Sequence, residues 1–164
     1  MVAFCKVLEK ILATVCAILM TVMVLDVTWQ VISRWILKNP SSVTEELARF
    51  IMIWIGFIGS AYAYKKYAHL GLDVLTSKLE GSRRRAAEWV AELLCIFFAG
   101  AIMVYGGFNV VALTLELNQI SPALQVKMGY VYAIIPISGA FICVFALERM
   151  VFGRPQHDLS VSVD

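Results

Sequence analysis

The sequence predicts an all-α integral membrane protein with four transmembrane helices and no soluble catalytic domain. Of its 164 residues, 60% are hydrophobic and only 16% are charged, whereas a soluble domain has about 25% charged residues. The apolar residues also fall in runs long enough for a membrane-spanning helix, which needs roughly 20 residues. Residues 1–154 are therefore expected to form one membrane domain, and residues 155–164 a polar cytoplasmic tail.

The first predicted span covers about residues 7–37 and is longer than a bilayer requires. At 1.5 Å per residue such a helix is ~45 Å long, so we expect it to tilt or to project beyond the hydrocarbon layer. Lys6 and Lys10 give it a basic start, as in a signal peptide, but no small-residue cleavage site follows. The prediction is an uncleaved first helix.

The second predicted span covers about residues 45–64. Ser41, Ser42 or Thr44 could cap this helix, and Thr44 is the best candidate by residue type and by the acids that follow it. Within the span, Gly56, Gly59 and Ser60 make the helix narrow. Small residues let membrane helices approach closely, so these three predict a helix-packing surface.

The remaining apolar runs predict spans at about residues 87–117 and 126–152. Between the second and third spans, residues 70–80 are too few and too polar to cross a membrane. If this stretch is helical, one face carries three leucines, Leu72, Leu75 and Leu79. That pattern predicts a short helix lying in the membrane interface, with an ordinary connecting loop as the alternative.

The basic residues are distributed unevenly across the predicted membrane. Ten of the 14 Lys and Arg residues lie at the two termini and in the middle loop. Positive residues concentrate in cytoplasmic loops, so both termini and the middle loop are predicted to be cytoplasmic. The other four are Arg34, Lys38, Arg49 and Lys127.

Charged residues in the first two spans are the candidate functional groups. Asp26 lies deep in the first span, where an acid costs about 2.5–3.5 kcal/mol. It is either a proton or cation site or a buried contact to another helix. Arg34, Glu45, Glu46 and Arg49 gather at the outer ends of these spans. Either acid can meet Arg49 on one helix face, which predicts an interfacial network, with solvated helix-end pairs as the alternative.

The tryptophans predict two kinds of environment. Trp35 and Trp89 lie near the ends of spans and are expected to anchor in the membrane interface, as do the three leucines of the 70–80 stretch. Trp54 sits deeper and is expected to pack between helices.

No residue pattern in the sequence indicates a cofactor or an enzyme. The two histidines, His69 and His157, lie outside the predicted spans, so axial ligands for a haem inside the bundle are missing. No HExxH zinc motif or phosphate-binding glycine loop occurs. We therefore expect no cofactor, no metal, no catalytic residue and no nucleic acid partner.

Several short motifs follow one another in an order that resembles a known family. In chain order they are Thr44-Glu45-Glu46-Leu47-Ala48-Arg49, Trp54, Gly56, Gly59-Ser60-Ala61, His69-Leu70-Gly71-Leu72-Asp73, Tyr132 through Pro136, and Gly139. Together with the size and the four spans, this order resembles the small membrane subunit, the Q-type subunit, of the tripartite ATP-independent periplasmic (TRAP) transporters.

The resemblance implies a function that a partner completes. Such transporters sit in the bacterial inner membrane and import organic acids, such as sialic acid or C4-dicarboxylates, with a sodium gradient. A periplasmic binding protein delivers the substrate to a large multi-span subunit, which holds the substrate and sodium sites. The small subunit is similar to a fixed scaffold in contact with membrane lipids. Its candidate interface residues here are Asp26, Arg34, Glu45, Glu46, Arg49, Trp54, Gly56, Gly59 and Ser60.

Two other functions fit parts of the sequence. A small, self-sufficient, proton-coupled multidrug exporter would use Asp26 as its acid, although the long basic middle loop and the biased charge argue against it. A structural subunit of a respiratory membrane complex would also lack cofactor ligands.

Overall fold

The computed structural model describes residues 2–36, 38, 41–66 and 82–152. The predicted interfacial helix at 70–80, with Leu72, Leu75 and Leu79, and the tail at 155–164 lie outside the described residues. The described helices are α1 (Val2–Trp35), α2 (Ser42–Lys65), α4 (Ser82–Phe97), the π-helix η1 (Phe98–Gly106), α5 (Gly107–Glu116), α6 (Met128–Tyr132) and α7 (Ile134–Phe152).

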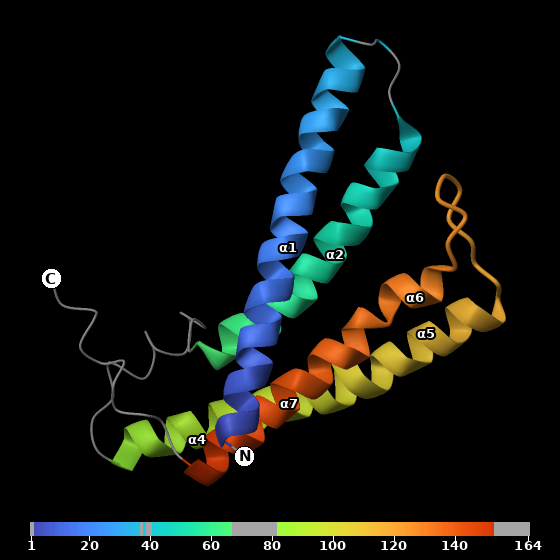
Figure 1. Cartoon of the computed structure of the whole chain (residues 1–164). Helices are drawn as coiled ribbons and strands as arrows, with labels where there is room; N and C mark the ends of the chain where they lie inside the picture. The colour runs from blue at the N-terminus through green and yellow to red at the C-terminus, as the bar shows by residue number, and fades with distance from the viewer. Residues whose placement is uncertain (1, 37, 39–40, 67–81, 153–164) are drawn as a thin grey trace, which may run out of the picture.

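Four helical stretches of the described chain are long and apolar enough to cross a membrane, which confirms the predicted fold class. They are Phe4–Trp35, Ser42–Lys65, Trp89–Glu116 and Met128–Met150. The third is one continuous rod made of α4, η1 and α5, and the fourth is made of α6 and α7 (Figure 1). Large apolar side chains are exposed along these stretches, such as Leu25 and Phe97, as expected of helices that face lipid.

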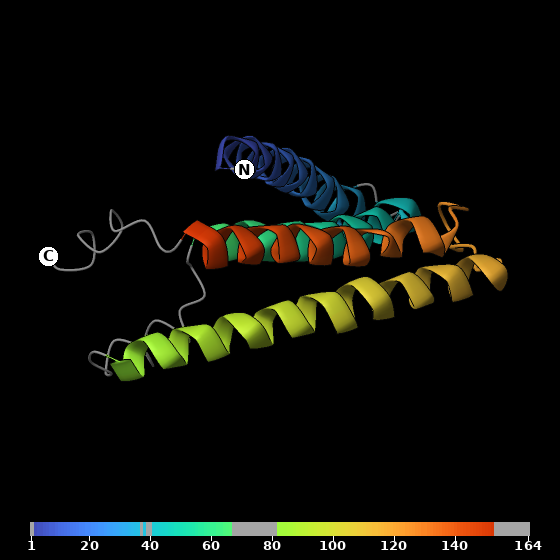
Figure 2. The same ribbon diagram turned by 90° about the horizontal axis from the view of Figure 1, so that it is seen from below.

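The helices form three layers, which Figure 2 shows from below. α1 lies on one side, α2 and α7 form the middle layer, and the rod from α4 to α5 lies on the other side. Among the described elements α1 packs on α2 and α7 and not on the third rod. α7 packs on α1, on α2 and on the third rod. The core lies around it, with Phe145 and Ala146 on α7 and Ile58 and Ala61 on α2.

The ends of the first two helices differ from the predicted bounds. α1 begins at Val2 and ends at Trp35, so it is longer at its start than the predicted span. α2 begins at Ser42, and the residue at its N-cap position is Ser41. The prediction that Thr44 is the N-cap was therefore wrong: its hydroxyl lies in the first turn and donates to the Ser41 carbonyl at 3.0 Å.

The fourth span is interrupted because of Pro136. Proline has no backbone N–H and its ring collides with the carbonyl four residues earlier, and the helix accordingly breaks at Ala133 between α6 and α7. Two glycines bring the third rod and α7 close together. A Cβ on Gly107 would lie 2.9 Å from the Pro136 ring, and a Cβ on Gly139 would lie 2.7 Å from the Met103 Cβ.

The connection from α5 to α6, residues 117–127, is a compact turn. An antiparallel bridge joins Ile120 to Lys127, and the Ser121 N–H donates to the Val126 carbonyl at 2.9 Å. Gln125 adopts a positive φ of 56° to close the turn. This turn lies at the same end of the molecule as the start of α2 (Figure 1).

Candidate subunit interface

An open apolar groove runs between α2, η1 and α7. Its volume is about 510 Å³. Its lining residues are Met52, Ile53, Gly56, Phe57, Ser60, Phe98, Ile102, Met103 and Ile135. The Ser60 hydroxyl donates to the Phe57 carbonyl at 2.8 Å, so its hydrogen is used within α2. The groove therefore presents an apolar surface at membrane depth.

Gly56 and Gly59 of α2 are not used for close packing within the described chain. A Cβ added to Gly56 or to Gly59 would meet no atom within 4 Å. Gly107, Gly129 and Gly139 are the opposite case, because a Cβ on each would come within 3.0 Å of a neighbouring helix. Gly56 and Gly59 thus lie on an open face of α2 that no described residue fills, and packing of a partner helix there stays a prediction.

At the outer end, Glu46 binds the turn between α5 and α6. Its Oε2 accepts from the backbone N–H groups of Ala123 at 2.9 Å and Leu124 at 2.8 Å. The carboxylate is 8% exposed, and charge-assisted bonds of this kind are stronger than neutral ones. Glu46 therefore fixes the 117–127 turn to the start of α2 across 77 residues of sequence.

The predicted four-residue cluster at this end is only partly assembled. Glu45 and Arg49 approach to 3.9 Å, and both side chains are largely exposed. Exposed pairs of this kind contribute about 0–1 kcal/mol. Arg34 is exposed, and within the described residues it makes no ion pair. Glu45 and Arg49 thus fit the alternative of a solvated helix-end pair, and Glu46 binds backbone amides instead of Arg49. A contact of this end with a partner stays a prediction.

Asp26 is buried in a contact between α1 and α2. The side-chain amide of Gln30 donates to Asp26 Oδ2 at 2.7 Å and to the Thr44 carbonyl at 3.0 Å. Asp26 is 8% exposed. This geometry fits the buried-contact alternative, in which the acid orients an amide that joins two helices.

Trp54 packs between helices, as its depth in the sequence predicts. Its indole N–H donates at 3.2 Å to the Val131 carbonyl in α6, close to the break at Ala133. Trp35 and Trp89 are largely exposed on helix surfaces, and both positions are compatible with membrane-interface anchors.

Sequence reasoning missed a buried polar cluster at the other end of the molecule. Tyr64 on α2 donates to Glu92 Oε1 on α4 at 2.5 Å, and Arg149 on α7 pairs with Glu92 Oε2 at 3.2 Å. The Arg149 guanidinium also lies over the Tyr64 ring, 4.9 Å from its centre. We call Tyr64, Glu92 and Arg149 the inner clamp, since these three side chains join three helices.

Two more ion pairs surround the inner clamp. Lys65 pairs with Glu148, and Lys66 pairs with Glu9 at 2.6 Å. The second pair brings α1 into the same end of the bundle. The sequence did contain a signal for these contacts. The three acids that make them, Glu9, Glu92 and Glu148, lie beside or inside apolar runs at the end that holds the basic residues. Those basic residues were interpreted only as an orientation signal.

The chain matches a known protein family over most of its length. Residues 23–154 match the family model described as "Tripartite ATP-independent periplasmic transporters, DctQ component". The chain is 26% identical over 145 residues to the sialic acid TRAP transporter small permease protein SiaQ of Vibrio cholerae, covering 88% of this chain and 82% of that one. It is 29% identical over 120 residues to the C4-dicarboxylate TRAP transporter small permease protein DctQ of Rhodobacter capsulatus, covering 70% and 52%.

A third relative carries the similar stretch within a much longer chain. It is the isethionate TRAP transporter permease protein DctMQ of Oleidesulfovibrio alaskensis, 28% identical over 107 residues. The match covers 65% of this chain and 17% of that protein. In that relative the small-permease stretch is therefore covalently part of a larger permease.

Proposed function

We propose, on the premise that this chain belongs to the DctQ component family of the TRAP transporters, that it is a rigid scaffold for a large permease subunit. As a member of that family it is a permease component of a transporter and not an enzyme.

The observation that carries the scaffold proposal is the unfilled groove beside Gly56. Membrane helices associate through close packing at small residues rather than through the hydrophobic effect. Gly56 and Gly59 offer such a surface and meet nothing in the described chain. In one relative the small-permease stretch is part of a larger permease, and this supports a large permease subunit as the partner of this surface. We place one helix of the large subunit in this groove, against Met52, Gly56 and Ser60.

Polar contacts at both ends of the bundle support a fixed rather than a moving role. The inner clamp joins α2, α4 and α7, and Glu46 ties the outer turn to α2. Buried polar networks whose members are satisfied make a core rigid. In the proposed complex the large subunit moves and holds the substrate and sodium sites, while this chain stays in place.

The substrate class and the membrane placement follow from the relatives and from the charge distribution. Relatives named for sialic acid and for C4-dicarboxylates make sodium-coupled import of an organic acid the proposed activity of the assembled transporter. The bias of basic residues supports a cytoplasmic location of both termini. A periplasmic binding protein would then dock on the outer side, where Glu46 holds the 117–127 turn.

The scaffold proposal is tested by filling the groove. Gly56→Leu should sharply reduce recovery of the tagged large subunit with this chain, while Gly56→Ala should reduce it less. In the described part of the chain no atom lies within 4 Å of a Cβ at this position, so the melting temperature of the isolated chain should not fall. Undiminished recovery with Gly56→Leu, at unchanged stability, would refute the assignment of this groove.

A charge reversal tests whether the outer end also takes part in binding the large subunit. Arg49 is largely exposed and its pairing with Glu45 is weak, so Arg49→Glu should leave the isolated chain intact. If the start of α2 contacts the large subunit, this variant lowers recovery. If recovery is unchanged, the interface is confined to the groove.

A further inference from the structure

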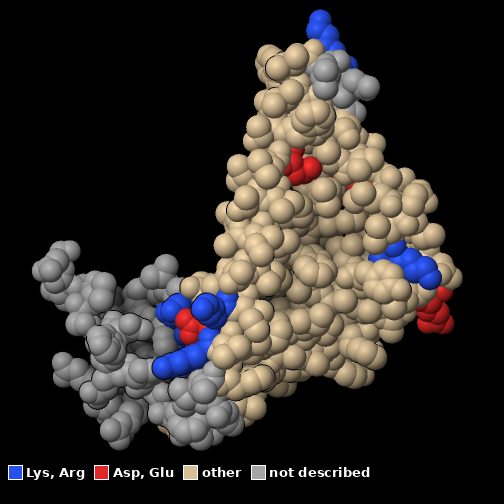
Figure 3. Space-filling view, in the orientation of Figure 1, with Lys and Arg blue, Asp and Glu red and all other residues tan. Residues whose placement is uncertain are grey.

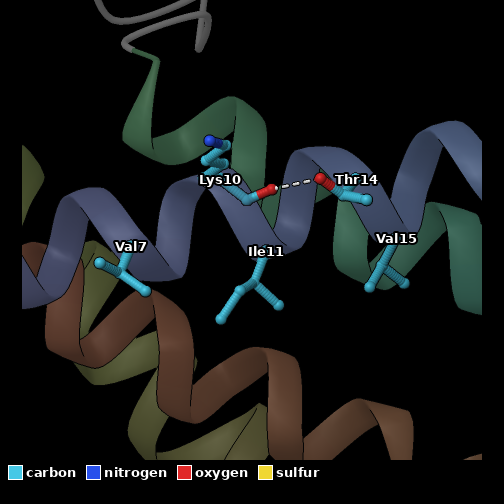
Figure 4. A pocket seen from close by; sticks show the side chains of 5 residues that line it. All are labelled: Val7, Lys10, Ile11, Thr14 and Val15. Carbon is cyan, nitrogen blue, oxygen red and sulfur yellow. Dashed lines mark hydrogen bonds between the residues drawn. The ribbon is translucent and has the colours of Figure 1, made fainter.

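A second groove lies on α1, at the end that carries the basic residues. It is lined by Val7, Lys10, Ile11, Thr14 and Val15 and has a volume of about 340 Å³. The spacing of these residues places them on one face of the helix over about 12 Å of its length. Figure 4 shows Val7 and Ile11 pointing to one side of α1 and Lys10 to the other, so the lysine forms one edge of the groove.

The walls of this groove are apolar apart from the lysine head. The Thr14 hydroxyl donates to the Lys10 carbonyl at 2.9 Å, which uses its hydrogen within the helix. Helical side chains lean toward the N-terminus, and Figure 4 shows the Lys10 ammonium on the Val7 side of its own backbone. The methylene stem of Lys10 thus borders the groove and its charge lies at the edge, a common behaviour of lysine at membrane interfaces.

Positive charge is in excess around this groove. Lys6 and Lys10 are both exposed on α1, and the nearby acid on that helix, Glu9, already pairs with Lys66 at 2.6 Å. Within the described part of the chain neither Lys6 nor Lys10 makes an ion pair. Figure 3 shows this gathering of basic side chains at the lower end of the molecule.

We propose that the α1 groove binds an anionic phospholipid, with its phosphate at Lys10 and one acyl chain along Ile11 and Val15. The groove is apolar, it lies on an exposed helix face, and an uncompensated positive charge stands at its edge. A protein helix fits less well, because β-branched Val7, Ile11 and Val15 hold a second backbone away, whereas Gly56 on α2 admits one. A lipid with a cationic headgroup would place an amine against two lysines.

The test compares lipid binding by the purified full-length chain in detergent, with native mass spectrometry as the readout. The probes are phosphatidylglycerol and phosphatidylcholine with the same acyl chains. The chain should bind phosphatidylglycerol more tightly. Lys10→Gln should weaken phosphatidylglycerol binding about fivefold, as expected for one basic residue near an anionic surface. The matched control is Lys127→Gln, since Lys127 is also exposed and lies at the other end of the bundle.

A second variant tests the acyl-chain part of the site. Ile11 is half exposed, so Ile11→Trp fills the groove without entering the core, and it should weaken binding of both lipids. Equal affinity for the two lipids, or an equal effect of Lys10→Gln and Lys127→Gln, would overturn the assignment of the headgroup. Full binding by the Ile11→Trp variant would overturn the assignment of the acyl chain.

Discussion

Replacing Arg149 by Gln should destabilise the bundle far more than replacing Arg49 by Gln. Both arginines pair with a glutamate, but the Arg149–Glu92 pair has side chains that are 14% and 10% exposed, and the Arg49–Glu45 pair has side chains that are 72% and 54% exposed. The two variants remove the same charge from opposite ends of the molecule. The difference between them therefore measures what burial does to an ion pair.

The magnitude follows from the geometry of the inner clamp. Removing Arg149 leaves the buried Glu92 carboxylate with the Tyr64 hydroxyl, at 2.5 Å, as its remaining hydrogen-bond partner among the described residues. Breaking a buried pair by removing one member costs about 3–5 kcal/mol, whereas an exposed pair is worth about 0–1 kcal/mol. For a chain of this size 1 kcal/mol corresponds to about 2–4 °C. Arg149→Gln should then lower the melting temperature by about 6–20 °C.

The assay is thermal unfolding of the purified chain in one detergent, with both single variants and the double variant Glu92→Gln/Arg149→Gln. The double variant removes the unpaired charge, so it should recover part of the lost stability. Similar small shifts for Arg149→Gln and Arg49→Gln would refute the reasoning, because they would mean that the inner clamp is solvated. A double variant that is less stable than Arg149→Gln alone would also refute it.

Three further outcomes are expected. Gly139→Ala should lower the free energy of unfolding by about 1–3 kcal/mol through overpacking against the third rod. Gly59→Ala, with open space around its Cβ, should not lower the melting temperature. Equal effects of the two variants would contradict the packing described. Glu46→Ala should speed hydrogen exchange at the amides of residues 123–124, which lose their acceptor, and unchanged exchange would show that the turn is held by other contacts. Asp26→Asn should cost less than about 1 kcal/mol, because an amide oxygen still accepts a hydrogen bond, and loss of uptake by the assembled transporter without loss of stability would instead make this acid functional.

The spans could be predicted because their signal is local. Each apolar run is contiguous, and its length alone identifies a membrane helix. The break at Ala133 was also within reach, since Pro136 is visible in the sequence and its effect on a helix is fixed by its ring. A packing surface at Gly56 was predicted from residue type, but the open space beside this residue is visible only in the three-dimensional structure.

The polar contacts could not be predicted because their partners are far apart in the chain. Glu46 binds amides 77 and 78 residues away, and Arg149 meets Glu92 across 57 residues. The local alternative for Glu46, a pair with Arg49 three residues later, was reasonable on helix spacing. For the buried Glu46 carboxylate, two backbone N–H groups in a tight turn are better partners than the exposed Arg49 side chain. No sequence pattern indicates which turn of the chain will lie near this carboxylate.

The way Glu46 holds the outer turn has a consequence for the thermodynamics of docking there. An unstructured loop loses about 1–2 kcal/mol of backbone entropy for each residue that a partner fixes. The 117–127 turn has already lost that freedom, through its bridge and its two bonds to the carboxylate. A protein that binds this turn contacts a surface that is already ordered. Its affinity is therefore not reduced by the free-energy cost of ordering the turn. After that protein dissociates, the turn keeps the same conformation for the next binding event.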